Sequence, residues 1–207
     1  MVKTSGSTTT PKPRPEYPVL LFAVKADWAD WLRANHAVEQ VVWLRFAKKA
    51  APFETVKYAE APDTALGYGW IDGQLKQFDE HSYLLKFTPR GKKSIWSKVN
   101  VGHVERLIAS GAMQPAGLAA VESAKRDGRW DRAYSSSSAS AVPDDFQQAL
   151  DAHPRAQAFF KTLKRDNRYA ILFRLETAVT AETPARRIRE FVLMLERGET
   201  IHPVKPA

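Results

Sequence analysis

The stretch Thr64-Ala65-Leu66-Gly67-Tyr68-Gly69-Trp70-Ile71-Asp72-Gly73-Gln74 places three glycines, two aromatic residues and one carboxylate in a short apolar run. Glycine is favoured where the backbone needs a positive φ or where another group approaches it closely. A buried tyrosine or tryptophan usually needs a hydrogen-bond partner for its polar atom. Ordinary core packing does not require this combination, so the stretch is a candidate pocket wall.

The residues on both sides of this stretch predict short strands and helices. Residues 41–46 are rich enough in β-branched and aromatic side chains for a strand. Residues 82–88 alternate in the same way and are ended by Pro89. The pair Asp72-Gly73 is a strong turn signal. We therefore expect a small antiparallel sheet in the N-terminal part.

Two aspartates predict where the N-terminal helices begin. Asp27 is placed to cap a helix that carries Trp28, Trp31 and Leu32 on one face, and Asp63 to cap the helix that leads into the glycine-rich stretch. These helices would pack on the sheet.

From Ser97 onward the apolar period changes from two residues to 3.6. Ser97 is placed to cap a helix that ends at Gly111, and Pro115 to start another that ends near Gly128. Further helical faces follow along the rest of the chain. Their apolar residues are Val101, Val104, Leu107, Ile108, Leu118, Val121, Phe146, Ala149, Leu150, Ala156, Phe159, Phe160, Leu163, Leu172, Leu175, Ile188, Phe191, Val192 and Leu195. The predicted fold class is α+β and mainly helical, with a C-terminal helical bundle after the sheet.

Composition divides the chain into four parts. Residues 1–15 form a Thr/Pro/Lys leader that cannot bury a core and is expected to be flexible. Residues 16–134 are predicted to form the α+β domain, 135–142 a serine-rich linker, and 143–200 a helical C-terminal subdomain.

The overall composition of the 207 residues excludes several classes of protein. The chain has no cysteine, which rules out disulfides, thiolate nucleophiles and cysteine-ligated metals. No apolar run approaches the roughly 18 residues that span a bilayer, and the N-terminus lacks the apolar middle of a signal peptide. We therefore expect a cytoplasmic protein. Its net charge of +8 permits binding to anionic ligands or nucleic acid.

The order and spacing of several motifs resemble a known family. After Tyr68 to Gln74 come Phe87-Thr88-Pro89-Arg90, Ser94-Ile95-Trp96-Ser97, Asn100, Gly111-Ala112-Met113 and Ala124-Lys125-Arg126-Asp127-Gly128-Arg129-Trp130, and then the stretch from Phe159-Phe160 to Glu182-Thr183-Pro184-Ala185-Arg186-Arg187-Ile188. This series resembles the bacteriocin-protection family, also called YdeI/OmpD-associated, over roughly residues 16 to 201. The chain has Gly67 where family members often carry cysteine, which argues against thiol chemistry there, and Pro184 where they often carry arginine. The resemblance implies a role in tolerance to bacteriocins or envelope stress and implies no established reaction.

Within the glycine-rich stretch, two side chains have alternative roles. Asp72 could accept a hydrogen bond from a ligand or act as a general base, and it could equally bond backbone amides in a turn. Trp70 could stack on a ring of a ligand, and it could equally be a core residue.

The segment Arg90-Gly91-Lys92-Lys93-Ser94 is the second candidate surface. Three cations around a glycine, next to Trp96, can meet a phosphate, although a solvated loop has the same composition. The spacing is not that of a P-loop. The candidate ligand-binding residues are therefore Tyr68, Trp70, Asp72, Arg90, Lys92, Lys93 and Trp96.

The remaining polar residues give weaker indications. The five histidines have no metal-ligand spacing, so neither a metal site nor a cofactor is predicted. Asp79-Glu80-His81 is assigned to solvent. The arginines of the last helix could grip phosphates or pair with nearby glutamates; they are Arg186, Arg187, Arg189 and Arg197. No catalytic residue is assigned.

Three functions remain open at this point. The first is a protein of the bacteriocin-protection type that acts by binding an unknown ligand or protein partner. The second is a module that binds nucleic acid or an anionic, phosphorylated ligand. The third is an enzyme acting on a small phosphorylated or sugar-containing substrate with Asp72 as the base, which no nucleophile or metal motif supports.

Overall fold

The computed structural model describes residues 17–178 and 182–203. The leader predicted for residues 1–15 therefore lies outside the described residues. The chain divides after Arg90 into two compact units, here called the N-terminal unit and the C-terminal unit. The serine-rich residues 135–142 lie inside the C-terminal unit, and their role as a subdomain boundary stays a prediction.

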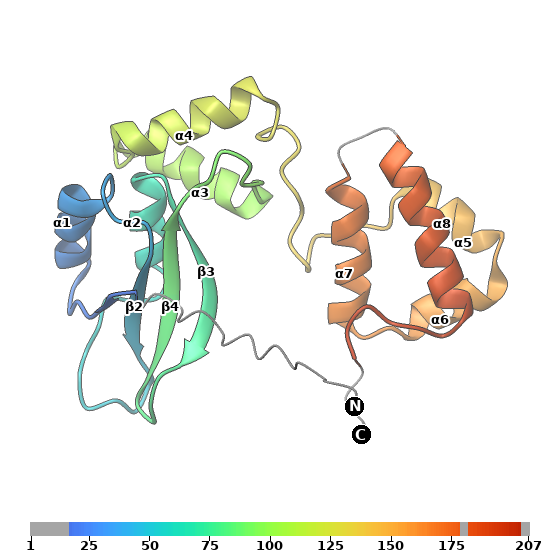
Figure 1. The fold of residues 1–207 in the computed structure, drawn as a ribbon, viewed down its shortest axis with the longest axis horizontal. Helices are drawn as coiled ribbons and strands as arrows, with labels where there is room; N and C mark the ends of the chain where they lie inside the picture. Colours follow the sequence, from blue (N-terminus) through green and yellow to red (C-terminus); the bar gives the residue numbers. More distant parts are fainter. Residues whose placement is uncertain (1–16, 179–181, 204–207) are drawn as a thin grey trace, which may run out of the picture. The chain divides into compact units, whose positions relative to one another are not determined.

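The N-terminal unit is built on a four-stranded sheet. Its strands run in the order β1-β2-β4-β3, with β4 between β2 and β3 (Figure 1). The elements are β1 (Val19–Leu20), α1 (Lys25–Asn35), β2 (Val42–Ala47), α2 (Ala61–Gly67), β3 (Trp70–Gln77) and β4 (Ser82–Pro89). The predicted α+β fold class is confirmed. The sheet is mixed rather than wholly antiparallel, because the two-residue β1 runs parallel to β2.

Aromatic side chains fill the core of the N-terminal unit. Trp28 of α1, Phe46 of β2 and Phe87 of β4 are almost fully buried, and the Trp28 ring lies 5.4 Å from that of Phe87. The Trp28 Nε1 donates to the Ala61 carbonyl oxygen at 3.1 Å and so joins α1 to the start of α2. Burying each phenyl side chain contributes about 1.5 to 3 kcal/mol.

The helix starts of this unit differ from the prediction. The residues at the N-cap positions of α1 and α2 are Val24 and Glu60, while Asp27 and Asp63 lie in the first turns. A carboxylate in the first turn is favoured by the helix dipole just as a cap is. An aspartate in the sequence therefore indicates that a helix begins nearby, but the first residue of the helix can lie a few positions before it.

Among the described residues of the C-terminal unit, the regular elements are all helices, and an isolated bridge joins Ser97 to Tyr134. Its helices are α3 (Lys98–Ala109), α4 (Pro115–Arg126), α5 (Asp144–Asp151), α6 (Pro154–Thr162), α7 (Arg165–Glu176) and α8 (Glu182–Glu196). The predicted cap is confirmed, since the Ser97 hydroxyl accepts from the Asn100 N–H at 3.1 Å. Gly111 and Gly128 follow α3 and α4 with φ of 69° and 74°, which only glycine adopts without strain.

One continuous apolar cluster joins α5 to α8. It includes Phe146, Phe160, Ile171 and Leu195, all at most 3% exposed. Ile108 and Leu118 were predicted to face the core but are 44% and 40% exposed. The buried stripe of each short amphipathic helix is narrow, so a residue at its edge turns toward solvent. None of the helices in the described part of the chain has both the length and the apolar character needed to span a membrane.

Candidate functional site

The glycine-rich stretch connects α2 to β3. Gly69 follows the end of α2 with φ of 75°, and its carbonyl oxygen accepts from the Arg90 N–H at 2.9 Å. The Tyr68 ring lies 5.3 Å from the ring of His36. Trp70 is 1% exposed, and its Nε1 donates to the His36 carbonyl oxygen at 3.2 Å. The indole is therefore part of the core, with its polar atom satisfied, and it presents no ring face to solvent.

Asp72 lies within β3 and not in a turn. It pairs with Phe87 across the β3–β4 ladder, whose register shifts between Asp72 and Leu75. The turn predicted at Asp72-Gly73 is therefore wrong. Gly73 lies at the shift in register instead, and glycine is common at such irregularities within strands. The pKa of the Tyr58 phenol is raised. Burial is the larger cause, and the negative charge of Asp72 is the smaller one.

The segment from Arg90 to Ser94, here called the basic loop, includes the point at which the chain divides into the two units. Arg90 closes the N-terminal unit, while Lys92, Lys93 and Trp96 belong to the C-terminal unit. Lys92 and Lys93 are exposed. Trp96 is 1% exposed and packs edge-on against Trp130 at 5.0 Å between ring centroids. Within the C-terminal unit the lysines are thus open to a ligand and the indole is not. Ligand contacts by the predicted site residues stay a prediction.

Arg129 fixes the loop that carries these lysines. Its guanidinium donates to the Ser94 carbonyl oxygen at 2.8 Å and to both oxygens of Asp127. The hydrogen bond from Arg129 contributes most to lowering the pKa of the Asp127 carboxyl. Arg129 lies within the motif quoted for the family resemblance, but its reach to Ser94 across 35 residues has no local sequence signal.

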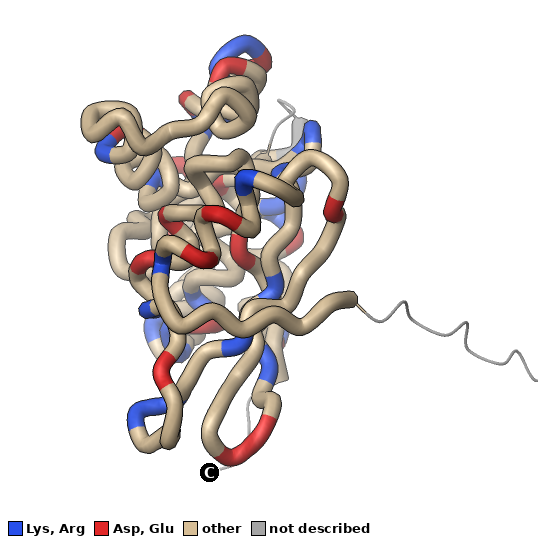
Figure 2. Tube along the Cα trace, turned by 90° about the vertical axis from the view of Figure 1, so that its left-hand side faces the viewer, with Lys and Arg blue, Asp and Glu red and all other residues tan. Residues whose placement is uncertain are grey.

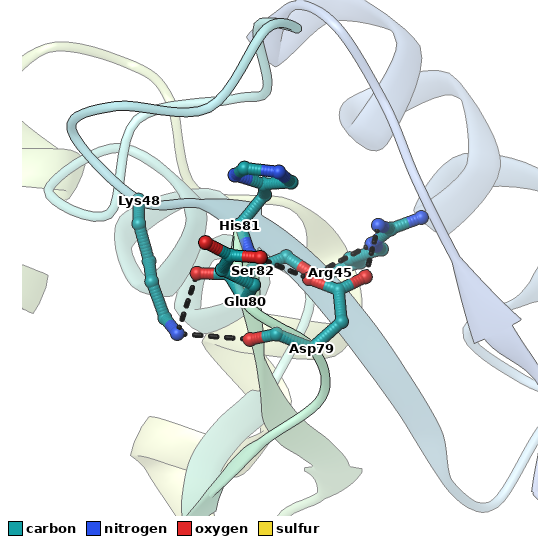
Figure 3. Close-up of polar contacts among 6 residues, drawn as sticks. All are labelled: Arg45, Lys48, Asp79, Glu80, His81 and Ser82. Carbon is teal, nitrogen blue, oxygen red and sulfur yellow. Dashed lines mark hydrogen bonds and ion pairs between the residues drawn. The ribbon is translucent and has the colours of Figure 1, made fainter.

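A polar cluster gathers at the hairpin end of the sheet, between β3 and β4 (Figure 3). Asp79 accepts from the Ser82 hydroxyl at 2.6 Å, from the His81 N–H at 2.9 Å and from Arg45 at 2.6 Å. These contacts lower the pKa of Asp79, with the Ser82 hydrogen bond as the largest cause. The Arg45 guanidinium also lies between the rings of Phe53 and Phe78, at 4.9 and 4.8 Å.

This cluster corrects the assignment of Asp79-Glu80-His81 to solvent. Glu80 and His81 are exposed, but Asp79 holds the hairpin to Arg45 of β2. The partner of Asp79 comes from another strand 34 residues away, which explains why the local polar pattern did not reveal it. Because its polar contacts are made within the protein, the cluster stabilises the hairpin.

A second polar network lies in the C-terminal unit around Glu176, the last residue of α7. Both oxygens of its carboxylate accept from the Ser135 N–H at 3.0 Å, and one also accepts from the Ser135 hydroxyl at 2.8 Å. Lys98 Nζ donates to that hydroxyl at 3.0 Å and lies 3.7 Å from the carboxylate. The Tyr169 hydroxyl donates to the Ser135 carbonyl oxygen at 3.0 Å.

Ser135 is consequently anchored. It is 7% exposed, although it lies in the residues that the sequence predicts to be a serine-rich linker. The preceding Tyr134 packs edge-on against Phe173 of α7, with 4.9 Å between ring centroids. Its backbone also bridges to the residues before α3 through the Tyr134 N–H and the Trp96 carbonyl oxygen, at 2.9 Å. Composition alone shows neither of these partners.

A cavity of about 430 Å³ opens beside this network, here called the Glu176 cavity. Its polar lining residues are Lys98, Ser135, Asp145 and Glu176. Its apolar lining comes from the chain before α5 and from the helices α7 and α8, and includes Val142, Pro143, Leu175, Pro184 and Ile188. An apolar wall with a few converging polar groups is the usual composition of a small-molecule site.

The predicted alternatives for the last helix are partly resolved. Arg186 lies 3.7 Å from Glu190 one turn later, and Arg197 pairs with Glu199 at 2.8 Å. Pairing on the protein surface accounts for these two arginines. Among the described residues no group of three or more histidine, aspartate or glutamate side chains is arranged to hold a metal ion.

The fold defines a two-unit α+β protein whose second unit is helical and carries the Glu176 cavity. Residues 139–198 match the family described as Bacteriocin-protection, YdeI or OmpD-Associated. The C-terminal helices therefore include a domain of the bacteriocin-protection type, and the resemblance predicted from the sequence is confirmed for these residues.

The N-terminal part has a different match. Residues 20–120 match a second family, described as Domain of unknown function (DUF8412). The motifs from Tyr68 to Met113, which contributed to the predicted resemblance, lie in these residues. No curated protein and no solved structure matches the chain.

Proposed function

We propose that this protein contributes to the tolerance of a bacterial cell to bacteriocins or envelope stress by binding a ligand or partner in the Glu176 cavity. The observation that carries the proposal is the coincidence of cavity and domain. Most residues that line the cavity lie within residues 139–198, which match the bacteriocin-protection family.

The shape and chemistry of the cavity support binding. The Glu176 carboxylate is held in place by Ser135 and Lys98, so the polar side is arranged before any ligand arrives. Preorganised groups lose little conformational entropy on association. The apolar side offers area whose burial contributes roughly 25 cal/mol per Å². A small amphipathic ligand, or an apolar side chain of a protein partner, fits this combination.

The exposed Lys92 and Lys93 belong to the proposal as a second contact. Among the described residues, neither side chain makes an ion pair within the protein. An anionic group on the partner would therefore not have to displace an internal carboxylate. Exposed lysines contribute mainly to the rate of association and to its dependence on salt.

The proposal is tested by filling the cavity. Ala141 lines the cavity and is exposed, so Ala141→Trp should occupy its mouth without disturbing the core. Ala152→Trp adds the same side chain at an exposed position at the end of α5 and serves as the matched control. Survival of a bacteriocin-sensitive bacterial strain expressing each variant is measured against bacteriocin dose.

We expect wild type and Ala152→Trp to raise survival and Ala141→Trp to lose this effect, with equal thermal unfolding temperatures for all three. Full protection by a folded Ala141→Trp protein would remove the cavity from the proposal. Absence of protection by the wild type, across bacteriocins and envelope stresses, would overturn the proposed function itself.

A further inference from the structure

A separate groove of about 830 Å³ lies in the N-terminal unit, here called the lysine groove. It is formed by the start of α1, the end of β2, the loop from β2 to α2, and Tyr83 of β4. Four lysines line it, namely Lys25, Lys48, Lys49 and Lys57, against two glutamates, Glu54 and Glu60. The groove therefore has two positive charges in excess.

This excess is local to the groove. Blue and red segments, which mark both signs of charge, occur along the trace of the N-terminal unit (Figure 2). Its described residues contain nine lysines and arginines and nine aspartates and glutamates, which balance. None of the ion pairs found among the described residues involves a lysine of the groove. Their charges are therefore available to an anion.

Lys48 is held in place without being neutralised. Its Nζ donates to the carbonyl oxygens of Asp79 and Glu80 at 2.9 and 3.0 Å, as the close-up of the hairpin end shows (Figure 3). Carbonyl oxygens orient an ammonium group but carry no net charge. A cation fixed in this way loses less side-chain entropy when it binds an anion.

Aromatic side chains contribute the other half of the groove. Tyr83 is stacked on the buried Phe46 at 5.4 Å, which fixes one wall. Tyr58 is 51% exposed, with its ring centroid 6.0 Å from that of Phe46. The Tyr58 ring can therefore accept a stacked planar group. The phenols also supply hydrogen-bond donors, because the ordinary pKa of tyrosine, about 10, already keeps them protonated at neutral pH; burial raises the pKa of Tyr58 and Tyr83 further.

We infer that the lysine groove binds a phosphorylated small molecule that carries an aromatic ring, of the nucleotide class. Ammonium and phenol groups are all donors, and phosphate oxygens are all acceptors, so the two sets are complementary. The ring would lie on Tyr58, and the phosphates would meet Lys25, Lys49 and Lys57. The volume of the groove is within the range of small-molecule sites. This site lies outside the residues matched to the bacteriocin-protection family and is independent of the function proposed above.

The test is calorimetric titration of the full chain with ATP, pyrophosphate and adenosine, at low and at physiological salt. The double variant Lys25→Ala/Lys57→Ala removes two charges from the groove. The double variant Lys161→Ala/Lys164→Ala removes the same charge from two exposed positions of the C-terminal unit that belong to neither proposed site, and it is the matched control. Tyr58→Leu removes the exposed ring and keeps an apolar side chain.

We expect ATP to bind more tightly than pyrophosphate or adenosine. Its affinity should fall as salt is raised, because salt ions screen the attraction between the lysines and the phosphates. The groove double variant should weaken ATP binding by at least about tenfold, while the control double variant at Lys161 and Lys164 leaves it unchanged. Tyr58→Leu should weaken ATP and leave pyrophosphate binding unchanged.

Three results would overturn the inference. No binding of ATP at low salt would remove the site. An equal loss in the two double variants, or a larger loss in the control variant, would show that the groove is not the anion site. Equal affinities for pyrophosphate and ATP would show that the ring is not recognised and would refute the nucleotide class.

Discussion

Both units hold a serine, a carboxylate and a cation together, but over different distances along the chain. In the N-terminal unit Asp79 accepts from Ser82, three residues later. In the C-terminal unit Glu176 accepts from Ser135, 41 residues earlier. The first network closes a hairpin and is complete in itself. The second joins a loop to the end of α7 and forms one side of a cavity, so similar groups serve stability in one place and a candidate binding site in the other.

The surroundings of the two networks differ as well. The Arg45 guanidinium of the first lies over two phenyl rings and its side chain is 25% exposed, whereas the Lys98 side chain of the second is 64% exposed. A desolvated cation interacts more strongly with its neighbours than one in water. Lys98 is paired with Glu176 and Ser135, but its exposed side chain remains accessible to a ligand in a way that Arg45 does not.

The largest expected effect tests whether the two units are stabilised separately. Trp70→Ala removes a fully buried indole from the N-terminal core, and the lost packing should lower the stability of that unit by roughly 3 to 5 kcal/mol. Chemical denaturation is followed by tryptophan fluorescence and by circular dichroism of the helices. We expect an early transition for the N-terminal unit and an unchanged one for the C-terminal helices. A single shifted transition in both signals would show that the units unfold together.

An intermediate effect is expected at the network beside the cavity. Glu176→Gln places an amide N–H₂ where one carboxylate oxygen now accepts from Ser135, which leaves a donor facing a donor. Such a mismatch costs about 1 to 3 kcal/mol, and the 28% exposure of this side chain favours the lower end. The control Glu190→Gln, at a surface pair with Arg186, should change stability by less than about 0.5 kcal/mol. Equal losses measured by urea denaturation would mean that the network is no stronger than a surface ion pair.

The smallest effect is expected at the hairpin network and should depend on pH. The pKa of Asp79 is lowered in the folded state, so its carboxylate stabilises the fold above the ordinary aspartate pKa, and this contribution is lost as pH falls through the lowered value. Asp79→Asn should therefore be less stable than wild type at neutral pH, and the difference should shrink as pH falls through the lowered pKa of Asp79. Urea denaturation across this range measures it. A difference that does not change with pH would show that the charge of Asp79 is unimportant.

Asp131→Asn is the control for that series. Asp131 is exposed, and its side chain makes no hydrogen bond or ion pair with the described part of the chain. Its substitution should leave the pH dependence of stability unchanged.

Local sequence determined most of the secondary structure. The sequence identifies Ser97 as a cap because a serine hydroxyl at the N-cap position accepts from a backbone N–H of the first helical turn, here that of Asn100. It identifies Gly111 and Gly128 as helix ends because only glycine adopts the required positive φ at little cost. The apolar periods also identified the faces of α5 to α8 that form one core. The turn predicted at Asp72-Gly73 is wrong, because this dipeptide lies within β3, where the register with β4 shifts. Dipeptide statistics do not distinguish these two uses.

The tertiary structure decided which side chains face one another. The sequence leaves two roles open for Trp70, and the fold decides between them by burying the indole with the His36 carbonyl oxygen as its hydrogen-bond partner. Ser135 was part of a featureless serine run until α7 brought Glu176 to it. The four lysines of the groove come from three separate parts of the chain, at residues 25, 48–49 and 57, so the sequence does not show that they share one groove. Sequence patterns encode interactions within a few residues, whereas cavities and remote networks depend on how whole elements pack.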